Sequence, residues 1–266
     1  MFNKQVIWIT GASSGIGEAL AVAFAEQAPG VQLVLSARRE AELKRVADRC
    51  VAAGMPRQQI LVLPLDVSEL DSLAGKADTV IDHLGQVDLL INNAGLSQRS
   101  LCKDTDISVY QKLMDVDVLG QIALTKAVLP HMLARKQGHI AVTASVAGKV
   151  GVKLRTGYCA AKHAVIGFFD ALRAEVEDEG VFVSTILPGF IATPIARNSL
   201  SADGSPFGKD DPDNAGGMDV DQCARVILTG LTKRKREIPV GDGKEMAALW
   251  LKRLAPELVF KLMKGR

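Results

Sequence analysis

Tyr158 and Lys162 are the two side chains of this sequence whose spacing best suits acid–base chemistry. They are four residues apart, so a helix that begins near Thr156 places both on one face, with their heads within reach of one ligand. A free tyrosine has a pKa of about 10, and an ammonium within ~4–6 Å favours the phenolate and lowers that value. The pair therefore predicts a tyrosine that exchanges a proton with a substrate while Lys162 supplies the ammonium.

A serine at the end of a predicted strand can join this pair. Ser145 closes the apolar run 140–145, and a strand there would present its hydroxyl at the carboxyl end, where it could polarise a substrate oxygen. A tyrosine four residues before a lysine also occurs by chance in many helices. The other motifs of the sequence have to distinguish a catalytic pair from a chance spacing.

A glycine-rich turn follows the first predicted strand, Val6–Thr10. Its spacing is Gly-x-x-x-Gly-x-Gly, not the Gly-x-Gly-x-x-Gly of the commonest dinucleotide fingerprint. Glycines at this place let the backbone approach a diphosphate, and the N-terminus of the next helix faces its negative charge. The alternative is a turn that binds no ligand. The residues of the turn that we predict to bind a dinucleotide are Gly11, Ser13, Ser14, Gly15, Ile16 and Gly17.

The composition argues against several classes of protein. The 266 residues are 48% hydrophobic and 23% charged, with a net charge of +2, which suits a globular chain with a full core. The sequence enters a predicted strand at once, without a signal peptide, and no apolar run reaches the ~18 residues of a membrane span. The four cysteines and four histidines form no ligand pattern, so we expect reduced thiols, no metal site and a cytoplasmic protein.

Apolar runs alternate with helical patterns along the whole chain. Strands that are apolar on both faces, each followed by a helix, predict a doubly wound parallel α/β sheet of the Rossmann type in a single domain. The expected strands are 6–10, 31–36, 60–65, 87–92, 140–144, 181–187 and 237–240, and the expected helices are 15–27, 40–53, 68–83, 106–136, 156–179 and 220–230.

Within this domain we expect a dinucleotide-binding and catalytic core at 1–194, a substrate lid at 195–218 and a closing part at 219–266. Residues 197–218 are rich in Ser, Gly, Pro and Asp and too polar for a core, which indicates a mobile lid or, alternatively, a surface loop without function. Apolar lid residues such as Leu200 and Phe207 favour an apolar substrate. Ser68 and Asp219 are expected to cap the helices that follow them.

Four motifs in order resemble the short-chain dehydrogenase/reductase family. They are the turn 10–17, Asn92-Asn93-Ala94-Gly95, Ser145 with Tyr158 and Lys162, and the run 188–193. Within the family, the runs 92–100, 124–126, 129–132 and 158–164 are similar to the dehydrogenase/reductase member 7 branch, which is close to 11-beta-hydroxysteroid dehydrogenases. Characterised members of that branch resemble membrane-associated reductases of steroids, retinoids or other carbonyls, and we expect this chain to work without their N-terminal anchor.

The resemblance implies an oxidoreductase that moves a hydride between a nicotinamide cofactor and a carbonyl or secondary alcohol. Tyr158 would be the acid in reduction and the base in oxidation, Lys162 would lower its pKa and hold the nicotinamide ribose, and Ser145 would steady the carbonyl. The same resemblance implies a homodimer or homotetramer that pairs through the two long helices. The further cofactor contacts that it implies are Asp66, Val67, Asn93, Ala94 and Gly95 on the adenine side and Pro188, Gly189, Ile191 and Thr193 near the carboxamide.

The end of the second strand favours NADP(H) over NAD(H). An NAD enzyme of this fold places a carboxylate there to bond the ribose 2′-hydroxyl, whereas this sequence has Ala37 followed by Arg38 and Arg39. An arginine can make a charge-assisted, two-pronged contact with the 2′-phosphate. The glycine turn carries no basic residue of its own, which leaves room for the use of both cofactors.

Asp117 departs from the family pattern. The family usually has an asparagine there, which holds a water that links the lysine to solvent. An aspartate keeps the acceptor oxygens but loses the amide donor, and a buried carboxylate is costly unless it is protonated or paired. We count Asp117 among the catalytic candidates and expect activity to survive the replacement.

The C-terminal stretch 247–263 is amphipathic and broken by Pro256. Such a helix more often packs across a subunit boundary or over the active site, and with the basic run 233–236 the alternative is contact with an anionic membrane surface. Nucleic-acid binding has little support, because aromatic residues are not interleaved with the basic ones. The prediction is thus an oxidoreductase that transfers a hydride between NADP(H) and a small, lipophilic carbonyl compound or secondary alcohol, and the alternative is an NADP-binding sensor or scaffold protein without turnover.

Overall fold

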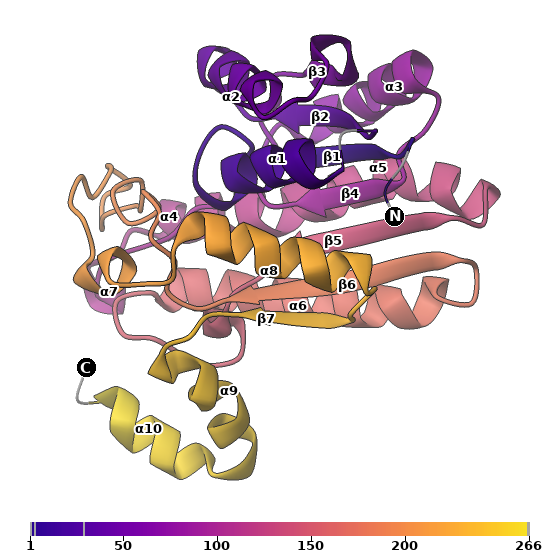
Figure 1. The fold of residues 1–266 in the computed structure, drawn as a ribbon. Coiled ribbons are helices and arrows are strands. Elements are labelled where there is room, and N and C mark those ends of the chain that lie inside the picture. Colours follow the sequence, from indigo (N-terminus) through magenta and orange to yellow (C-terminus); the bar gives the residue numbers. More distant parts are fainter. Residues whose placement is uncertain (1, 3, 29, 265–266) are drawn as a thin grey trace.

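The computed structural model describes residues 2, 4–28 and 30–264 and builds them around one seven-stranded sheet (Figure 1). Its strands are β1 (Val6–Thr10), β2 (Gln32–Ser36), β3 (Ile60–Val62), β4 (Leu89–Asn92), β5 (Gly138–Thr143), β6 (Val181–Pro188) and β7 (Glu237–Val240). All of them run parallel, in the order β3-β2-β1-β4-β5-β6-β7. The chain reverses its direction of winding between β1 and β4, and the carboxyl ends of the strands at such a switch point border the crevice in which ligands bind.

Helices cover both faces of this sheet. The helices are α1 (Gly15–Gln27), α2 (Glu40–Ala52), α3 (Leu73–Leu84), α4 (Ile107–Met114), α5 (Gly120–Ala134), α6 (Thr156–Val176), α7 (Pro212–Ala215), α8 (Val220–Thr232), α9 (Lys244–Leu254) and α10 (Pro256–Lys264). One core packs α1, α2 and α8 against the sheet, and the second packs α3, α5 and α6 against its other face. The prediction of a single, doubly wound α/β domain is confirmed.

The first strand shows why the parallel strands have to be apolar throughout. Ile7 and Ile9 belong to the core under α1, α2 and α8, whereas Val6 and Trp8 belong to the opposite core. Successive side chains of a strand point to opposite faces, so a strand covered on both sides has no solvent face for polar residues. Because β1 is packed on both faces, its carboxyl end, where the glycine-rich turn begins, is held in a fixed position.

The long helix expected at 106–136 is divided into α4 and α5 by a π-helical turn, Asp115–Leu119. A π turn adds a residue to the helical repeat and re-aims the side chains within it. Asp117 thereby becomes completely buried. Directly after the turn, Gly120 lies so close to the next layer that a Cβ on it would stand 2.4 Å from the carbonyl oxygen of Val67.

Several expected element ends differ from the structure, and one expected helix cap is confirmed. The third strand stops at Val62, earlier than expected. Ser68 caps no helix, because its N–H and hydroxyl donate to Oδ1 of Asp66 at 2.9 and 2.7 Å, and α3 begins only at Leu73. Asp219 does cap α8, since its carboxylate accepts two N–H groups of the first turn. The boundaries of the lid at 195 and 218 stay a prediction.

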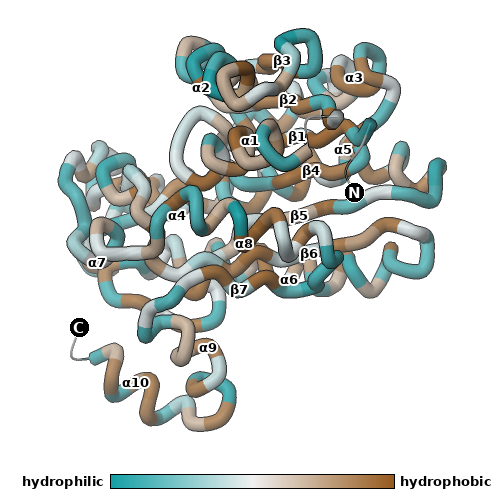
Figure 2. Tube along the Cα trace, viewed as in Figure 1, coloured by the Kyte–Doolittle hydropathy of each residue, from teal (hydrophilic) through white to brown (hydrophobic). Residues whose placement is uncertain are grey.

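The last two helices form a hairpin that stands apart from the two helical layers (Figure 1). Figure 2 shows apolar residues along it, and Trp250, Leu254, Leu258 and Phe260 are exposed. None of the helices in the described ranges has the length and apolar character needed to cross a bilayer. Contact of this hairpin with an anionic membrane surface, pairing into a homodimer or homotetramer, and a cytoplasmic location stay predictions.

The crowding at Gly120 predicts that alanine, which usually stabilises a helix relative to glycine, destabilises the protein at this position. Alanine in a helix interior normally gains up to ~1 kcal/mol over glycine, but Gly120→Ala should lower the free energy of unfolding by about 1–3 kcal/mol, because its Cβ meets the Val67 carbonyl. Gly167 in α6 is the matched control, since a Cβ added there would have no neighbour within 4 Å and alanine should stabilise the helix. Urea unfolding of both variants measures this, and changes of equal sign would contradict the packing.

Candidate active site

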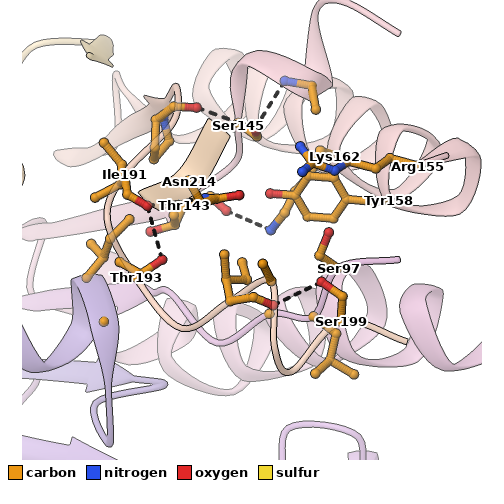
Figure 3. Close-up of a pocket in the computed structure, with 18 of the residues that line it drawn as sticks. Ser97, Thr143, Ser145, Arg155, Tyr158, Lys162, Ile191, Thr193, Ser199 and Asn214 are labelled. Atoms are coloured by element: carbon orange, nitrogen blue, oxygen red, sulfur yellow. Dashed lines mark hydrogen bonds between the residues drawn. The ribbon is translucent and has the colours of Figure 1, made fainter. Parts of the chain in front are cut away.

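A cavity of about 1010 Å³ lies at the carboxyl ends of the central strands (Figure 3). Nearly all the residues predicted from the sequence meet in its wall, although they come from segments far apart in the chain. The predicted residues that line it are Gly11, Ser13, Ser14, Gly15, Ile16, Arg38, Arg39, Asp66, Val67, Asn93, Ala94, Gly95, Ser145, Tyr158, Lys162, Pro188, Gly189, Ile191 and Thr193.

Two predicted residues stand behind the wall instead. Gly17 was expected to contact a cofactor, but a Cβ on it would lie 2.4 Å from the carbonyl oxygen of Gly11, so this glycine serves the close packing of α1 on the turn. Asp117 does not line the cavity, but it contacts Lys162 and the backbone N–H of Leu96, two residues that do. Both positions support residues of the wall.

Lys162 is held at the centre of the site by two acceptors. Its Nζ donates to the carbonyl oxygen of Thr143 at 2.9 Å and lies 3.5 Å from Oδ2 of Asp117. One helical turn earlier on α6, the Tyr158 ring has its centroid 5.7 Å from the same Nζ. Lys162 is only 3% exposed, so its charge acts on the phenol with little screening by water.

Ser145 lies two residues after the end of β5 and faces the same space as Tyr158 (Figure 3). Its Oγ accepts the N–H of Ala147 at 3.1 Å and donates to the carbonyl oxygen of Pro188 at 3.4 Å. These bonds fix the hydroxyl between β5 and β6. A phenol, an ammonium and a hydroxyl thus converge on one point of the cavity, an arrangement that can hold a carbonyl oxygen and exchange a proton with it.

Asp117 is a buried carboxyl group beside the lysine. Its Oδ1 accepts the N–H of Leu96 at 2.6 Å, while Oδ2 makes no hydrogen bond within the described residues and has only the 3.5 Å ion-pair contact with Lys162. Burial raises the pKa of the Asp117 carboxyl, and the attraction of Lys162 and the Leu96 N–H act in the opposite direction. The sequence could not show this balance, because it depends on the π-helical turn.

The glycine-rich turn forms a backbone cradle. Gly11 and Gly15 have φ angles of +66° and +58°, a region that favours glycine, and a Cβ on Gly11 would stand 2.8 Å from the Cα of Ala94. The hydroxyl of Thr10 accepts the N–H groups of Asn93 and Ala94, each at 3.0 Å, which ties the turn to the end of β4. The cradle at the N-terminus of α1 has the shape and charge that a dinucleotide diphosphate requires.

The end of β2 brings two cations to the same cavity. Arg38 and Arg39 both line it, and Nη2 of Arg39 donates to Oγ of Ser13 at 3.3 Å. Asp66 lies on the neighbouring loop; burial raises the pKa of its carboxyl, but the hydrogen bonds from Ser68 and the charges of Arg38 and Lys112 together lower that pKa below its usual value. The guanidinium groups and the hydroxyls of the glycine turn therefore face one end of the cavity together.

Sequence reasoning missed a charged cluster at the other end of the cavity. Arg155 donates to Oδ2 of Asp211 at 2.6 Å, and Arg99 donates to the same oxygen. It also left open where the C-terminal hairpin packs; Leu251, Val259 and Met263 line the cavity, so the alternative of packing over the active site holds in this structure. The amphipathic pattern of the hairpin was the available signal, whereas the arginines carry no local motif.

The raised pKa of Asp117 predicts how the free energy of unfolding depends on pH. Because that pKa is raised above its value of 3.8 in the unfolded chain, the folded state binds more protons in the window between the two values, and the free energy of unfolding falls as the pH rises through it. Asp117→Asn removes this titration, so the stability of the variant relative to the wild type should grow from pH 4 to pH 8. Chemical unfolding at several pH values tests this, with Asp115→Asn, which removes a partly exposed carboxylate from the same turn, as control; a flat difference for Asp117→Asn would contradict it.

Comparison with known proteins agrees with this geometry. A family model described as short chain dehydrogenase matches residues 5–204. The chain is 42% identical to human dehydrogenase/reductase SDR family member 7 over 256 residues, which cover 96% of this chain and 75% of the relative. It is 41% identical to the dehydrogenase/reductase SDR family protein 7-like of Anopheles gambiae, over 99% of this chain and 83% of that one.

Solved structures give the same result. A short chain dehydrogenase/reductase from Burkholderia phymatum, in complex with NAD, is similar with a TM-score of 0.83 and 27% identity, covering 97% of this chain and 95% of that chain. A metagenomic short-chain oxidoreductase in complex with NADP is similar with a TM-score of 0.66 and 32% identity, covering 70% and 83%. The predicted resemblance to the dehydrogenase/reductase member 7 branch is confirmed, and the chain belongs to the short-chain dehydrogenase/reductase family.

Proposed function

We propose that this protein transfers a hydride between NADP(H) and a lipophilic carbonyl compound or the corresponding secondary alcohol, with Tyr158 as the acid and base. As a member of its family the chain is an oxidoreductase of alcohol or carbonyl groups that uses a nicotinamide cofactor. The observation that carries the proposal is the convergence of Tyr158, Lys162 and Ser145 in a cavity that also contains the glycine cradle.

In reduction, the phenol of Tyr158 donates its proton to the oxygen of the substrate carbonyl, and in oxidation the phenolate takes it back. When a substrate is bound, the Ser145 hydroxyl would turn its one hydrogen from the Pro188 carbonyl to the same oxygen, which would orient the carbonyl and stabilise the negative charge that develops on it. The glycine turn and the residues at the end of β2 would hold the nicotinamide cofactor, which would supply or accept the hydride. Lys162, held by Thr143, keeps a positive charge next to the phenol and faces the cavity where a ribose would lie.

Several features support NADP(H) as the cofactor. Ala37 leaves the end of β2 without a carboxylate, and Arg38, Arg39 and Ser13 line the same end of the cavity. A phosphate there would gain charge-assisted hydrogen bonds. The rival cofactor is NAD, since similar structures hold one or the other. Arg38 and Arg39 favour the phosphorylated form.

An apolar part of the cavity wall supports a lipophilic substrate. Val146 and Val150, after β5, pack with Val259 of the hairpin, and Leu251 and Met263 border the same cluster. Such a wall gains free energy by removing apolar surface of a ligand from water, at roughly 25 cal/mol per Å². Steroids, retinoids and aromatic ketones all present surface of this kind.

A sensor or scaffold that binds NADP without turnover is the rival from another class. Its support is Asp117, whose carboxyl occupies the place of the asparagine of the family pattern. The intact group of Tyr158, Lys162 and Ser145 opposes it, because a protein that only binds the cofactor has no need of a buried phenol and ammonium facing the same cavity.

The main test follows NADPH and NADH absorbance with a panel of steroids, retinal, aromatic ketones and diketones. Wild-type protein should oxidise NADPH with at least one of them, and Tyr158→Phe should lower turnover by about 10²–10⁴-fold, since general acid catalysis contributes a factor of this size. NADPH fluorescence titration of the variant confirms that the cofactor still binds. Tight NADPH binding by the wild type with no turnover across the panel would favour the sensor.

The cofactor end of the cavity yields a separate prediction. Arg38→Met should raise the KM for NADPH by about ten- to hundredfold, because a charge-assisted bond to the 2′-phosphate is lost, and should change the KM for NADH little. Arg57→Met is the control, since Arg57 pairs with Asp48 on the surface, outside the lining of the cavity. Equal effects of Arg38→Met on both cofactors would assign Arg38 to packing and leave NAD as the better candidate.

A further inference from the structure

A buried carboxylate joins two arginines at the substrate end of the cavity. Arg99 lies in the loop after β4, Arg155 lies directly before α6, and Asp211 lies directly before α7. Nη2 of Arg155 donates to Oδ2 of Asp211 at 2.6 Å, and Nη1 of Arg99 donates to the same oxygen. The Asp211 side chain is 3% exposed, that of Arg155 14% and that of Arg99 27%. All three line the cavity that contains Tyr158.

Among the described side chains of this cluster, the two guanidinium groups share the one carboxylate of Asp211, so their charges sum to +1. Each guanidinium has five N–H donors, and the bond to Asp211 uses one of them. Lys153 and Glu245 also line the cavity with opposite charges, and the Glu245 carboxylate accepts the N–H of Phe190. Arg197 and Asp210 pair with each other outside the lining. A cation pair that exceeds its buried partner in charge, and that borders a cavity, attracts an anion.

Aromatic rings fix the orientation of both guanidinium groups. The Phe207 ring lies against Arg99 with its centroid 5.4 Å from Cζ, and the Phe190 ring lies against Arg155 at 5.9 Å. Stacking of this kind and the shared bond to Asp211 remove rotamer freedom before a ligand arrives, so less entropy is lost on binding. Figure 3 shows Arg155 entering the cavity beside Tyr158, which follows it by three residues.

We propose that Arg155 and Arg99 recognise a carboxylate on the substrate, which makes the substrate class a lipophilic keto acid or hydroxy acid. The inference rests on the proposed function and narrows its substrate. The planar fork of a guanidinium matches a carboxylate in two parallel hydrogen bonds, which a steroid ketone or an aldehyde without an acid group cannot use. Asp211 is a positioning residue that holds the two arginines toward the cavity.

The test compares a panel of keto acids with their methyl esters, which keep the carbon skeleton and lose the charge. Wild-type kcat/KM with NADPH should be higher for the acid than for its ester by about ten- to hundredfold, the factor of one charge-assisted hydrogen bond. Arg155→Met and Arg99→Met should each lower this acid-to-ester ratio, mainly through the KM for the acid. Arg197→Met is the control, because Arg197 lies in the segment that also carries Asp211, pairs with Asp210 and does not line the cavity, so the ratio should stay that of the wild type.

A binding measurement separates the two proposals. The shift of the unfolding temperature of the NADPH complex on addition of acid or ester is read for each variant, and it needs no turnover. If no compound of any panel is turned over, the proposed function fails. The carboxylate site is still supported in that case if the acid raises the unfolding temperature more than its ester does and if Arg155→Met removes this difference. The carboxylate site is overturned if ester and acid are equal in both rate and shift, or if the arginine variants lower both to the same extent.

Discussion

The buried ammonium of Lys162 is the group on which the rest of the active site depends. A cation removed from water is costly unless it is paired and hydrogen-bonded. Thr143 provides the hydrogen bond from the end of β5, and Asp117 provides the opposite charge from the π-helical turn. The division of the expected long helix is therefore a requirement of the site, because a regular helix would aim Asp117 elsewhere. Strand, turn and α6 must all be in place before Tyr158 has a charged neighbour.

Features with a local pattern could be predicted from the sequence, and those that depend on distant partners could not. The strands are continuous apolar runs because they are covered on both faces, and their positions followed from that pattern. The π-helical turn escaped because residues 106–136 are helical on both sides of it. The Arg99–Asp211 pair joins positions 112 residues apart, so no window of sequence contains it. Ser68 was misread because Asp66, two residues earlier, captures its hydroxyl.

Two buried aspartates show how position along the strands separates stability from function. Asp88 lies at the amino end of β4, accepts the N–H of Val6 at 2.9 Å and pairs with Arg135 at 2.6 Å. It joins the first strand, the fourth strand and the segment after α5 on the side of the sheet away from the cavity. Asp211 is also a buried carboxylate paired with arginine, but it lies at the carboxyl ends of the strands, next to the ligand crevice. In a parallel sheet, an ion pair at the amino ends of the strands therefore indicates a role in stability, and one at the carboxyl ends indicates a role in ligand binding.

The C-terminal hairpin forms part of the cavity wall without taking part in the sheet. Glu245 attaches its first turn to the backbone N–H of Phe190 at 3.3 Å, and Val259 is its one buried apolar side chain among the residues described in α9 and α10. Replacements on its inner face therefore change the shape of the substrate wall while both main cores keep their packing. Such a segment lets a lineage of enzymes exchange one substrate for another at little cost in folding, with the catalytic group preserved.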